Sequence, residues 1–148
     1  MHFLTISLAT CLLLISQSIA VSDVTTKFHF SGTISCNRTD RGSHYVSWIE
    51  LWESDSIVDT EWTRFADDRL EQNYTLDWSK NPVKFALDAV AHGDGFEMIS
   101  QEYELYYRIK HNCNKDRAPE IKKINVFGTF VTADRAYRHI GERLDVTS

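Results

Sequence analysis

The sequence predicts an all-β protein, a small antiparallel β-sandwich, from two observations. Residues 27–36, 45–53 and 103–111 each alternate between apolar and polar side chains with a period of two, which is typical of half-buried strands. Turn-forming residues separate these segments from weaker ones. A total of six to eight short strands in about 128 residues is the pattern of a sandwich.

Three strands are predicted clearly. In the first, residues 27–36, one face is apolar and ends in a cysteine: Phe28, Phe30, Gly32, Ile34 and Cys36. In the second, residues 45–53, Ile49 and Leu51 are expected to face inward. The third, residues 103–111, alternates most regularly, and its apolar face consists of Tyr103, Leu105, Tyr107, Ile109 and His111. Continuing that alternation puts Cys113 on the same face, so both cysteines are expected at strand ends on the core side.

The remaining elements are weaker. Further strands are predicted at 60–65, 73–78, 83–88 and 121–130, and the glycines of 92–95 predict a turn. Two segments are compatible with short helices, Asp67–Gln72 and residues 132–143. The length allows one domain, and no internal repeat or low-complexity tract divides it.

The overall charge excludes one class of function. The chain has 16 Lys and Arg against 21 Asp and Glu, a net charge of −5. Proteins that bind nucleic acids without sequence preference usually carry a surplus of basic residues, so this function is not predicted here.

The first twenty residues predict a signal peptide. Residues 1–20 contain no Asp, Glu, Lys or Arg, and they hold a short apolar run, Leu8–Ile15, which is too short to span a bilayer. The run is followed by Ser18-Ile19-Ala20, with small residues at the positions that signal peptidase recognises. We therefore expect a secreted protein with a mature domain at residues 21–148 and no membrane span.

In a secreted protein, the two remaining cysteines can form a disulfide and two asparagines can be glycosylated. Cys36 and Cys113 remain in the mature chain, and in an oxidising compartment they are a candidate disulfide, with two free cysteines as the alternative. Such a bridge would be worth about 4 kcal/mol on the chain-entropy model. Two N-glycosylation acceptors, Asn37 in Asn37-Arg38-Thr39 and Asn73 in Asn73-Tyr74-Thr75, agree with this compartment and are expected to face solvent.

Three segments together resemble the nematode transthyretin-like family. They are Phe30–Cys36, Ile49–Asp55 and Leu105–Cys113, and the family's paired cysteines match Cys36 and Cys113. The resemblance covers about Lys27 to Phe130. It implies a secreted, transthyretin-like (prealbumin-like) β-sandwich with Greek-key topology and one disulfide. Some members of the family are thought to act as extracellular binding or bridging proteins. Residues 56–82 are longer than the family's central loop, so no loop function is carried over.

Enzymatic activity is not predicted. A related branch of the fold hydrolyses 5-hydroxyisourate with His and Arg side chains and a C-terminal Tyr-Arg-Gly-Ser, whereas the nearest stretch here is Tyr137-Arg138-His139-Ile140. No hydrolase or phosphate-binding motif is present, and the histidines lack metal-ligand spacing, so neither cofactor nor metal is expected. His111 is expected to be a core histidine, and Asp67 and Asp68 a solvated turn rather than a calcium site.

A binding surface is predicted from charge and aromatic residues. A candidate patch for an anionic partner, such as a lipid head group or an acidic receptor, consists of Arg108, Lys110, Lys115, Arg117, Lys122 and Lys123. The alternative is a solvated face that keeps the sheet soluble. On the polar side of the alternation, Trp48, Trp52 and Tyr106 are candidate anchors of a protein interface, or they pack under the segment 56–82.

The sequence thus predicts a secreted binding protein whose partner is an extracellular protein or a lipid head group. The alternative function is a carrier of a small hydrophobic ligand, which in transthyretin itself occupies a channel between subunits. No oligomeric state is predicted.

Overall fold

The computed structural model describes residues 24–38, 45–54, 67–77, 79–92 and 102–148. The predicted signal peptide, the strand expected at 60–65 and the glycines of the turn at 92–95 lie outside these residues. Within them the protein is all-β. The strands are Thr25–Ser35 (β1), Val46–Glu53 (β2), Asp68–Asn73 (β3), Val83–His92 (β4), Glu102–Tyr103 (β5), Leu105–His111 (β6), Glu120–Asn125 (β7), Phe130–Val131 (β8) and Arg135–Asp145 (β9). No helix in the described part of the chain is long and apolar enough to cross a bilayer.

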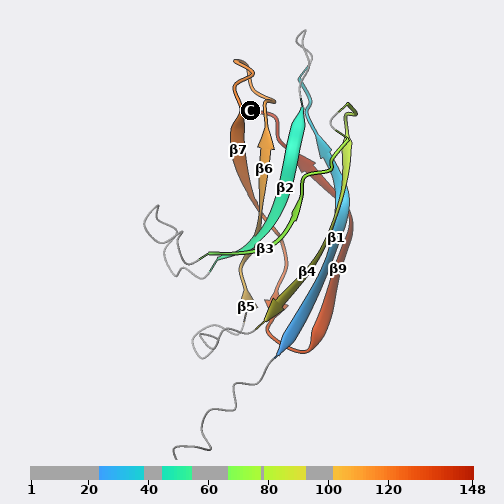
Figure 1. The fold of residues 1–148 in the computed structure, drawn as a ribbon, viewed down its shortest axis with the longest axis vertical. Coiled ribbons are helices and arrows are strands. Elements are labelled where there is room, and N and C mark those ends of the chain that lie inside the picture. Colours follow the sequence, from blue (N-terminus) through green and yellow to red (C-terminus); the bar gives the residue numbers. More distant parts are fainter. Residues whose placement is uncertain (1–23, 39–44, 55–66, 78, 93–101) are drawn as a thin grey trace, which may run out of the picture.

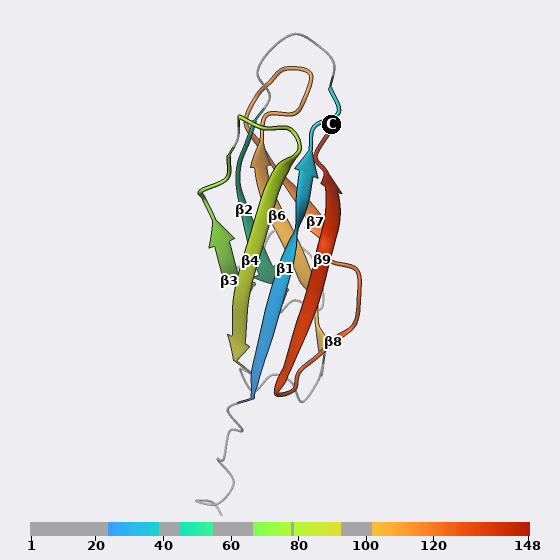
Figure 2. The ribbon, with the colours of Figure 1, turned by 90° about the vertical axis from the view of Figure 1, so that its right-hand side faces the viewer.

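The strands form two main sheets that face each other, with a short pair at one end (Figure 1). We call the three-stranded sheet β4-β1-β9 sheet A and the four-stranded sheet β3-β2-β6-β7 sheet B. The pair β5-β8 lies beside them. Figure 2 shows sheet A from outside, with sheet B behind it. The sandwich-like, all-β architecture predicted from the sequence is confirmed.

The core fills the space between sheets A and B. β4 shows the alternation of a half-buried strand over its whole length, with every second residue buried. Ile49 and Leu51 of β2 are fully buried, as predicted. Part of the core is a cluster of aromatic rings: Phe28, Phe30 and Phe130 pack with ring centroids 5.7–6.0 Å apart, a spacing typical of favourable aromatic pairs.

The segment expected to form a terminal helix is instead the long strand β9, so that prediction is wrong. β9 lies parallel to β1. The sequence predicted an antiparallel sandwich, and this one pair of strands departs from that prediction. A bulge in β9 explains why the strand was not predicted. The register with β1 shifts between Ser31 and Gly32, and Gly141, the extra residue of β9 at this point, adopts φ +80°. Tyr137 and His139 face inward before this shift and Glu142 and Leu144 after it, so the period of two is interrupted.

The other short helix, predicted at Asp67–Gln72, is also wrong, because residues 68–73 form β3. The helix-favouring Leu, Glu and Gln of this segment are overridden by antiparallel pairing with β2. The strand predicted at 73–78 is accordingly displaced, since β3 ends at Asn73 and residues 74–77 are irregular. The strand predicted at 121–130 is divided into β7 and the start of β8.

Candidate functional surfaces

A disulfide joins the two sheets at one end of the sandwich. Cys36 follows β1 of sheet A and Cys113 follows β6 of sheet B, and the two are bonded with their Cα atoms 5.8 Å apart. Both are buried. The predicted bridge between core-facing strand ends is confirmed, and the alternative of two free cysteines is not.

The two predicted glycosylation acceptors lie at opposite edges of the sandwich. Asn37 is exposed, and its Nδ2 donates to Asp145 Oδ2 at 2.7 Å. Asn73 ends β3, where its Oδ1 accepts hydrogen bonds from the backbone and the hydroxyl of Thr75. Its Nδ2 donates to the carbonyl of Ala86 on β4, 3.3 Å away. Glycosylation at these positions stays a prediction.

Aromatic and cationic side chains gather on the outer face of sheet B. Trp52 stacks on Tyr106 at 6.4 Å, and Trp48 meets Tyr74 edge to face at 6.1 Å. Arg108 lies over the Trp52 ring at 4.8 Å and Lys123 over the Tyr106 ring at 4.0 Å, within cation–π range. We call these six residues, Trp48, Trp52, Tyr74, Tyr106, Arg108 and Lys123, the aromatic face.

A buried carboxylate fixes the aromatic face from below. Glu50 is 4% exposed although its position on β2 points outward, because the surrounding rings cover it. Trp52 Nε1 donates to one carboxylate oxygen at 2.8 Å and Tyr74 Oη to the other at 3.1 Å. The guanidinium groups of Arg69 and Arg108 lie 3.6 and 3.8 Å away. Since a buried charge is tolerated only when it is paired and hydrogen-bonded, these partners are locked in place.

Tyr106 is buried against a residue of the segment 56–82, in agreement with the second of the two alternatives for this side chain. Its hydroxyl donates to Asp67 Oδ2 at 2.6 Å, and Asp67 is itself buried. The prediction of a solvated turn at Asp67 and Asp68 is therefore wrong, because Asp67 is buried beside Tyr106 and Asp68 begins β3. No group of three or more His, Cys, Asp or Glu in the described residues is arranged to hold a metal ion.

The structure does not bring the predicted anionic-partner patch together as one surface. Arg108, Lys110 and Lys123 lie on the outer face of sheet B, but Arg108 faces the carboxylate of Glu50. Lys115 and Arg117 lie in the turn between β6 and β7. Lys122 has the opposite parity, and its Nζ donates to the carbonyl of Thr147 at 3.1 Å.

A second basic surface, not predicted from the sequence, lies on the outer face of sheet A. The register places four rows across β4, β1 and β9, with the outward residues Val90–Lys27–Ala136, Asp88–His29–Arg138, Ala86–Ser31–Ile140 and Lys84–Thr33–Arg143. A further outward pair, Ser35–Asp145, follows on β1 and β9. The cations Lys27, Lys84, Arg138 and Arg143 have no carboxylate partner among the described residues. We call them the basic face. Only a strand prediction for 135–145 would have revealed it.

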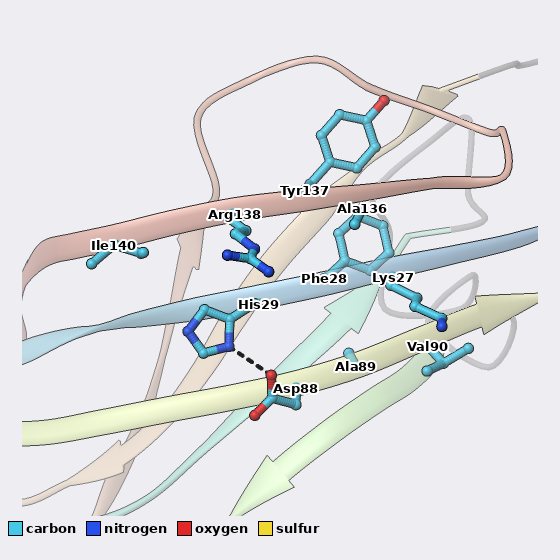
Figure 3. Close-up of a pocket in the computed structure, with 10 residues that line it drawn as sticks. All are labelled: Lys27, Phe28, His29, Asp88, Ala89, Val90, Ala136, Tyr137, Arg138 and Ile140. Atoms are coloured by element: carbon cyan, nitrogen blue, oxygen red, sulfur yellow. Dashed lines mark hydrogen bonds and ion pairs between the residues drawn. The ribbon is translucent and has the colours of Figure 1, made fainter.

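The middle of the basic face is hollowed (Figure 3). The depression has a volume of about 390 Å³, and its lining includes the outward residues Lys27, His29, Asp88, Val90, Arg138 and Ile140. His29 Nδ1 lies 2.6 Å from Asp88 Oδ1, so the carboxylate at the centre of this face is engaged with the imidazole. Ile140 is 73% exposed at the rim. The hollow thus combines apolar surface with Lys27 and Arg138, two cations that have no carboxylate partner in the part of the chain that the structure describes.

Two interior histidines lie in different settings. His111 is fully buried, as predicted; its Nδ1 accepts a hydrogen bond from the Cys113 backbone. Burial lowers its pKa, and the Glu120 carboxylate, 3.5 Å from Nε2, opposes that effect. His139 packs against Phe30 and its Nδ1 lies 2.9 Å from Glu142 Oε1.

The carboxylate of Glu142 also accepts a hydrogen bond from the hydroxyl of Tyr107. Burial, reinforced by this carboxylate, raises the pKa of the Tyr107 phenol far above its usual range. The phenol therefore stays a hydrogen-bond donor inside the sandwich.

Comparisons with known proteins leave the family open. No protein-family model matches the chain, and no curated protein matches it. Among solved structures, a crystal structure of a 9R-lipoxygenase from Cyanothece PCC8801 is similar at 18% identity and a TM-score of 0.36. The alignment covers 80% of this chain and 16% of that chain, so the chain spans about a sixth of the enzyme's length. A likeness at that score carries no argument about fold or activity.

Proposed function

We propose that this protein is a secreted, extracellular binding protein of transthyretin-like type and that the aromatic face is its docking surface for a protein partner. The observation that carries the proposal is the composition of that face. Trp, Tyr and Arg are the residues most enriched at the energetic centres of protein interfaces. Here they occupy adjoining positions on one sheet, on β2, on β6 and just after β3.

The aromatic face is prepared for binding. Glu50 fixes Trp52 and Tyr74 through hydrogen bonds, and Asp67 fixes Tyr106. Side chains that are already ordered lose little conformational entropy when a partner docks, so more of the contact energy appears as affinity. Tyr74 is 52% exposed, which leaves ring surface for a partner to cover.

Several features support the transthyretin-like topology and secretion as parts of the proposal. The three segments that carry the resemblance correspond to β1, β2 and β6, which are the inner strands of the two sheets. The chain crosses between sheets from β1 to β2, from β3 to β4 and from β4 to β6, as in Greek-key sandwiches. A disulfide that joins the sheets fits an oxidising compartment.

The opposite face suggests bridging as the mode of action. The aromatic face lies outside sheet B and the basic face outside sheet A, so two partners of different chemistry have room on one molecule. A small rigid domain with two such faces acts as a link between, for example, a receptor and a second extracellular component.

The docking surface is tested by cell binding. The secreted, fluorescently labelled protein is titrated onto animal cells, and bound protein is measured by flow cytometry. Trp48→Ala/Trp52→Ala is expected to weaken saturable binding at least tenfold, because loss of central aromatic anchors costs about 2 kcal/mol or more. Phe127→Ala, which removes an 88% exposed ring outside the face, is expected to bind normally. Equal binding of the double variant and the native protein would refute the assignment.

A second function, carriage of a small hydrophobic ligand, is favoured by the hollow on sheet A. Its apolar side chains and the cations Lys27 and Arg138 suit an apolar molecule with an acidic group. Native mass spectrometry of the secreted, deglycosylated protein tests this directly. A reproducible extra mass that solvent removes, and that is lost in Ile140→Glu, supports the carrier. A bare mass counts against it.

A further inference from the structure

The outer edge of β9 is an open sheet edge. β9 is 11 residues long and pairs with β1 on one side (Figure 2). In the part of the chain that the structure describes, no strand pairs with its other side. In a parallel pair, every second residue directs its N–H and C=O away from the neighbour, so this edge presents a row of unpaired backbone groups.

The edge is held in an extended shape at both ends. Before β9, the backbone N–H of Thr25 donates to Asp134 Oδ1 at 2.9 Å. After it, the N–H of Val146 donates to the carbonyl of Ser35 at 3.1 Å, and Val146 is fully buried. A strand that is already extended and anchored loses little entropy when another strand pairs with it.

Most of the exposed charges on β9 are basic, and its one exposed carboxylate, Asp145 at the end of the strand, accepts hydrogen bonds from Asn37 Nδ2 and the backbone of Thr147. Arg138 and Arg143 are exposed on β9 and have no carboxylate partner among the described residues. The carboxylate of Glu142 lies between them in sequence, but the bulge turns it inward, where Tyr107 and His139 hold it. Arg138 and Arg143 are separated along one outward face of β9, so the edge favours a partner strand that carries carboxylates on that side.

We propose that the open edge of β9 binds an extended, acidic segment of a partner protein by β-strand addition. Main-chain hydrogen bonds to β9 provide the pairing, and carboxylates on the outward side of the added strand meet Arg138 and Arg143. The exposed side chain of Ile140 accepts an apolar neighbour on the same side. This inference rests on the proposed bridging function, for which it supplies the second partner. Its test uses variants of β9 rather than of the aromatic face, so strand addition and docking at the aromatic face can fail independently.

The experiment uses a fluorescein-labelled, end-capped peptide of four Glu-Val repeats and the full secreted protein. Binding is measured by fluorescence anisotropy at low and at physiological salt. The native protein is expected to bind, and Arg138→Glu/Arg143→Glu is expected to bind at least tenfold more weakly. Lys110→Glu/Lys115→Glu changes the net charge equally on another part of the molecule and is expected to bind as the native protein does. Circular dichroism confirms that both variants are folded.

Backbone pairing is tested separately from charge. The same peptide with every residue N-methylated keeps its carboxylates but has no backbone N–H donor on either edge, and it is expected to lose binding. Equal binding of the methylated peptide, or equal effects of the two double variants, would overturn strand addition in favour of general attraction. Absence of peptide binding together with binding to vesicles containing phosphatidylserine would replace the acidic peptide by a lipid surface.

Discussion

The pairing of β1 with β9 makes a sharp prediction for Gly32. This glycine lies opposite Glu142 at the bulge, and a Cβ atom added to it would lie 2.1 Å from the Glu142 carbonyl oxygen. Real Cβ atoms stay beyond 3.0 Å of such atoms, so in Gly32→Ala the two strands must part by about 1 Å. The obstacle is backbone held in a ladder, which cannot rotate away as a side-chain tip can.

We expect Gly32→Ala to lower the free energy of unfolding by about 3 kcal/mol, the upper end of ordinary overpacking costs. With a urea m-value of about 2 kcal/mol/M, the midpoint falls by about 1.5 M. Urea unfolding of the disulfide-bonded protein, followed by tryptophan fluorescence and circular dichroism, measures this shift. The native protein and the variant are expected to have the same m-value.

Gly141→Ala is the matched control, because an added Cβ there meets nothing within 4 Å. Its φ of +80° makes the cost conformational, about 1 kcal/mol. The structure thus predicts that the Gly32 variant is clearly the less stable of the two. If residues 132–143 formed a helix instead, Gly32→Ala would be neutral or slightly stabilising in an exposed strand. A change below about 0.5 kcal/mol at Gly32 would refute the parallel pairing.

Three further predictions concern the interior. Replacing both Cys36 and Cys113 by Ala is expected to cost about 4 kcal/mol, measured by urea unfolding, because the lost bridge closes a loop with a separation of 77 residues. Burial lowers the pKa of His111 below its ordinary 6.5, so the unfolded chain binds more protons near that pH; the free energy of unfolding is expected to fall as pH drops below about 6.5. His111→Gln is expected to flatten this slope between pH 5 and 7. Tyr107→Phe leaves the Glu142 carboxylate without its phenol donor, and we expect a loss of about 2 kcal/mol in urea unfolding.

Each of these predictions has an outcome that would contradict it. Equal stability of the oxidised and cysteine-free proteins would show that the bridge does not constrain the unfolded chain. A stability that stays constant or rises from pH 7 to pH 5 would mean that His111 is not held in its neutral form. A neutral Tyr107→Phe substitution would place the phenol in contact with water rather than with Glu142.

The strands that the sequence predicted well are those with one buried face. β1, β2 and β6 each alternate in sequence because one side carries the apolar residues of the core and the other carries mostly polar residues and aromatic rings of the outer face. β9 escaped prediction because its bulge reverses the phase at Gly141, and no local pattern reveals its partner across more than 100 residues. β3 escaped because its helix-favouring residues owe their conformation to pairing with β2.

The two candidate surfaces were predictable only in part, because they too depend on contacts between strands that are distant in the sequence. The alternation of β2 placed Trp48 and Trp52 on one outward face, but the carboxylate beneath them, Glu50, gave no signal as a buried charge. Arg108 was read as free for a partner, whereas the fold directs it to Glu50 and Trp52. The basic face depends on which strands lie side by side, and that order emerges only from the tertiary structure.

Photo-crosslinking at the aromatic face tests the central claim most directly. Benzoylphenylalanine placed at Trp48 in the secreted protein is activated on cells, and crosslinked species are compared with those from the same label at Phe127. A discrete partner captured at Trp48, competed by unlabelled native protein and absent at Phe127, is the predicted result. Identical products from both positions, or no competable product at Trp48, would contradict the assignment of the aromatic face as the docking surface.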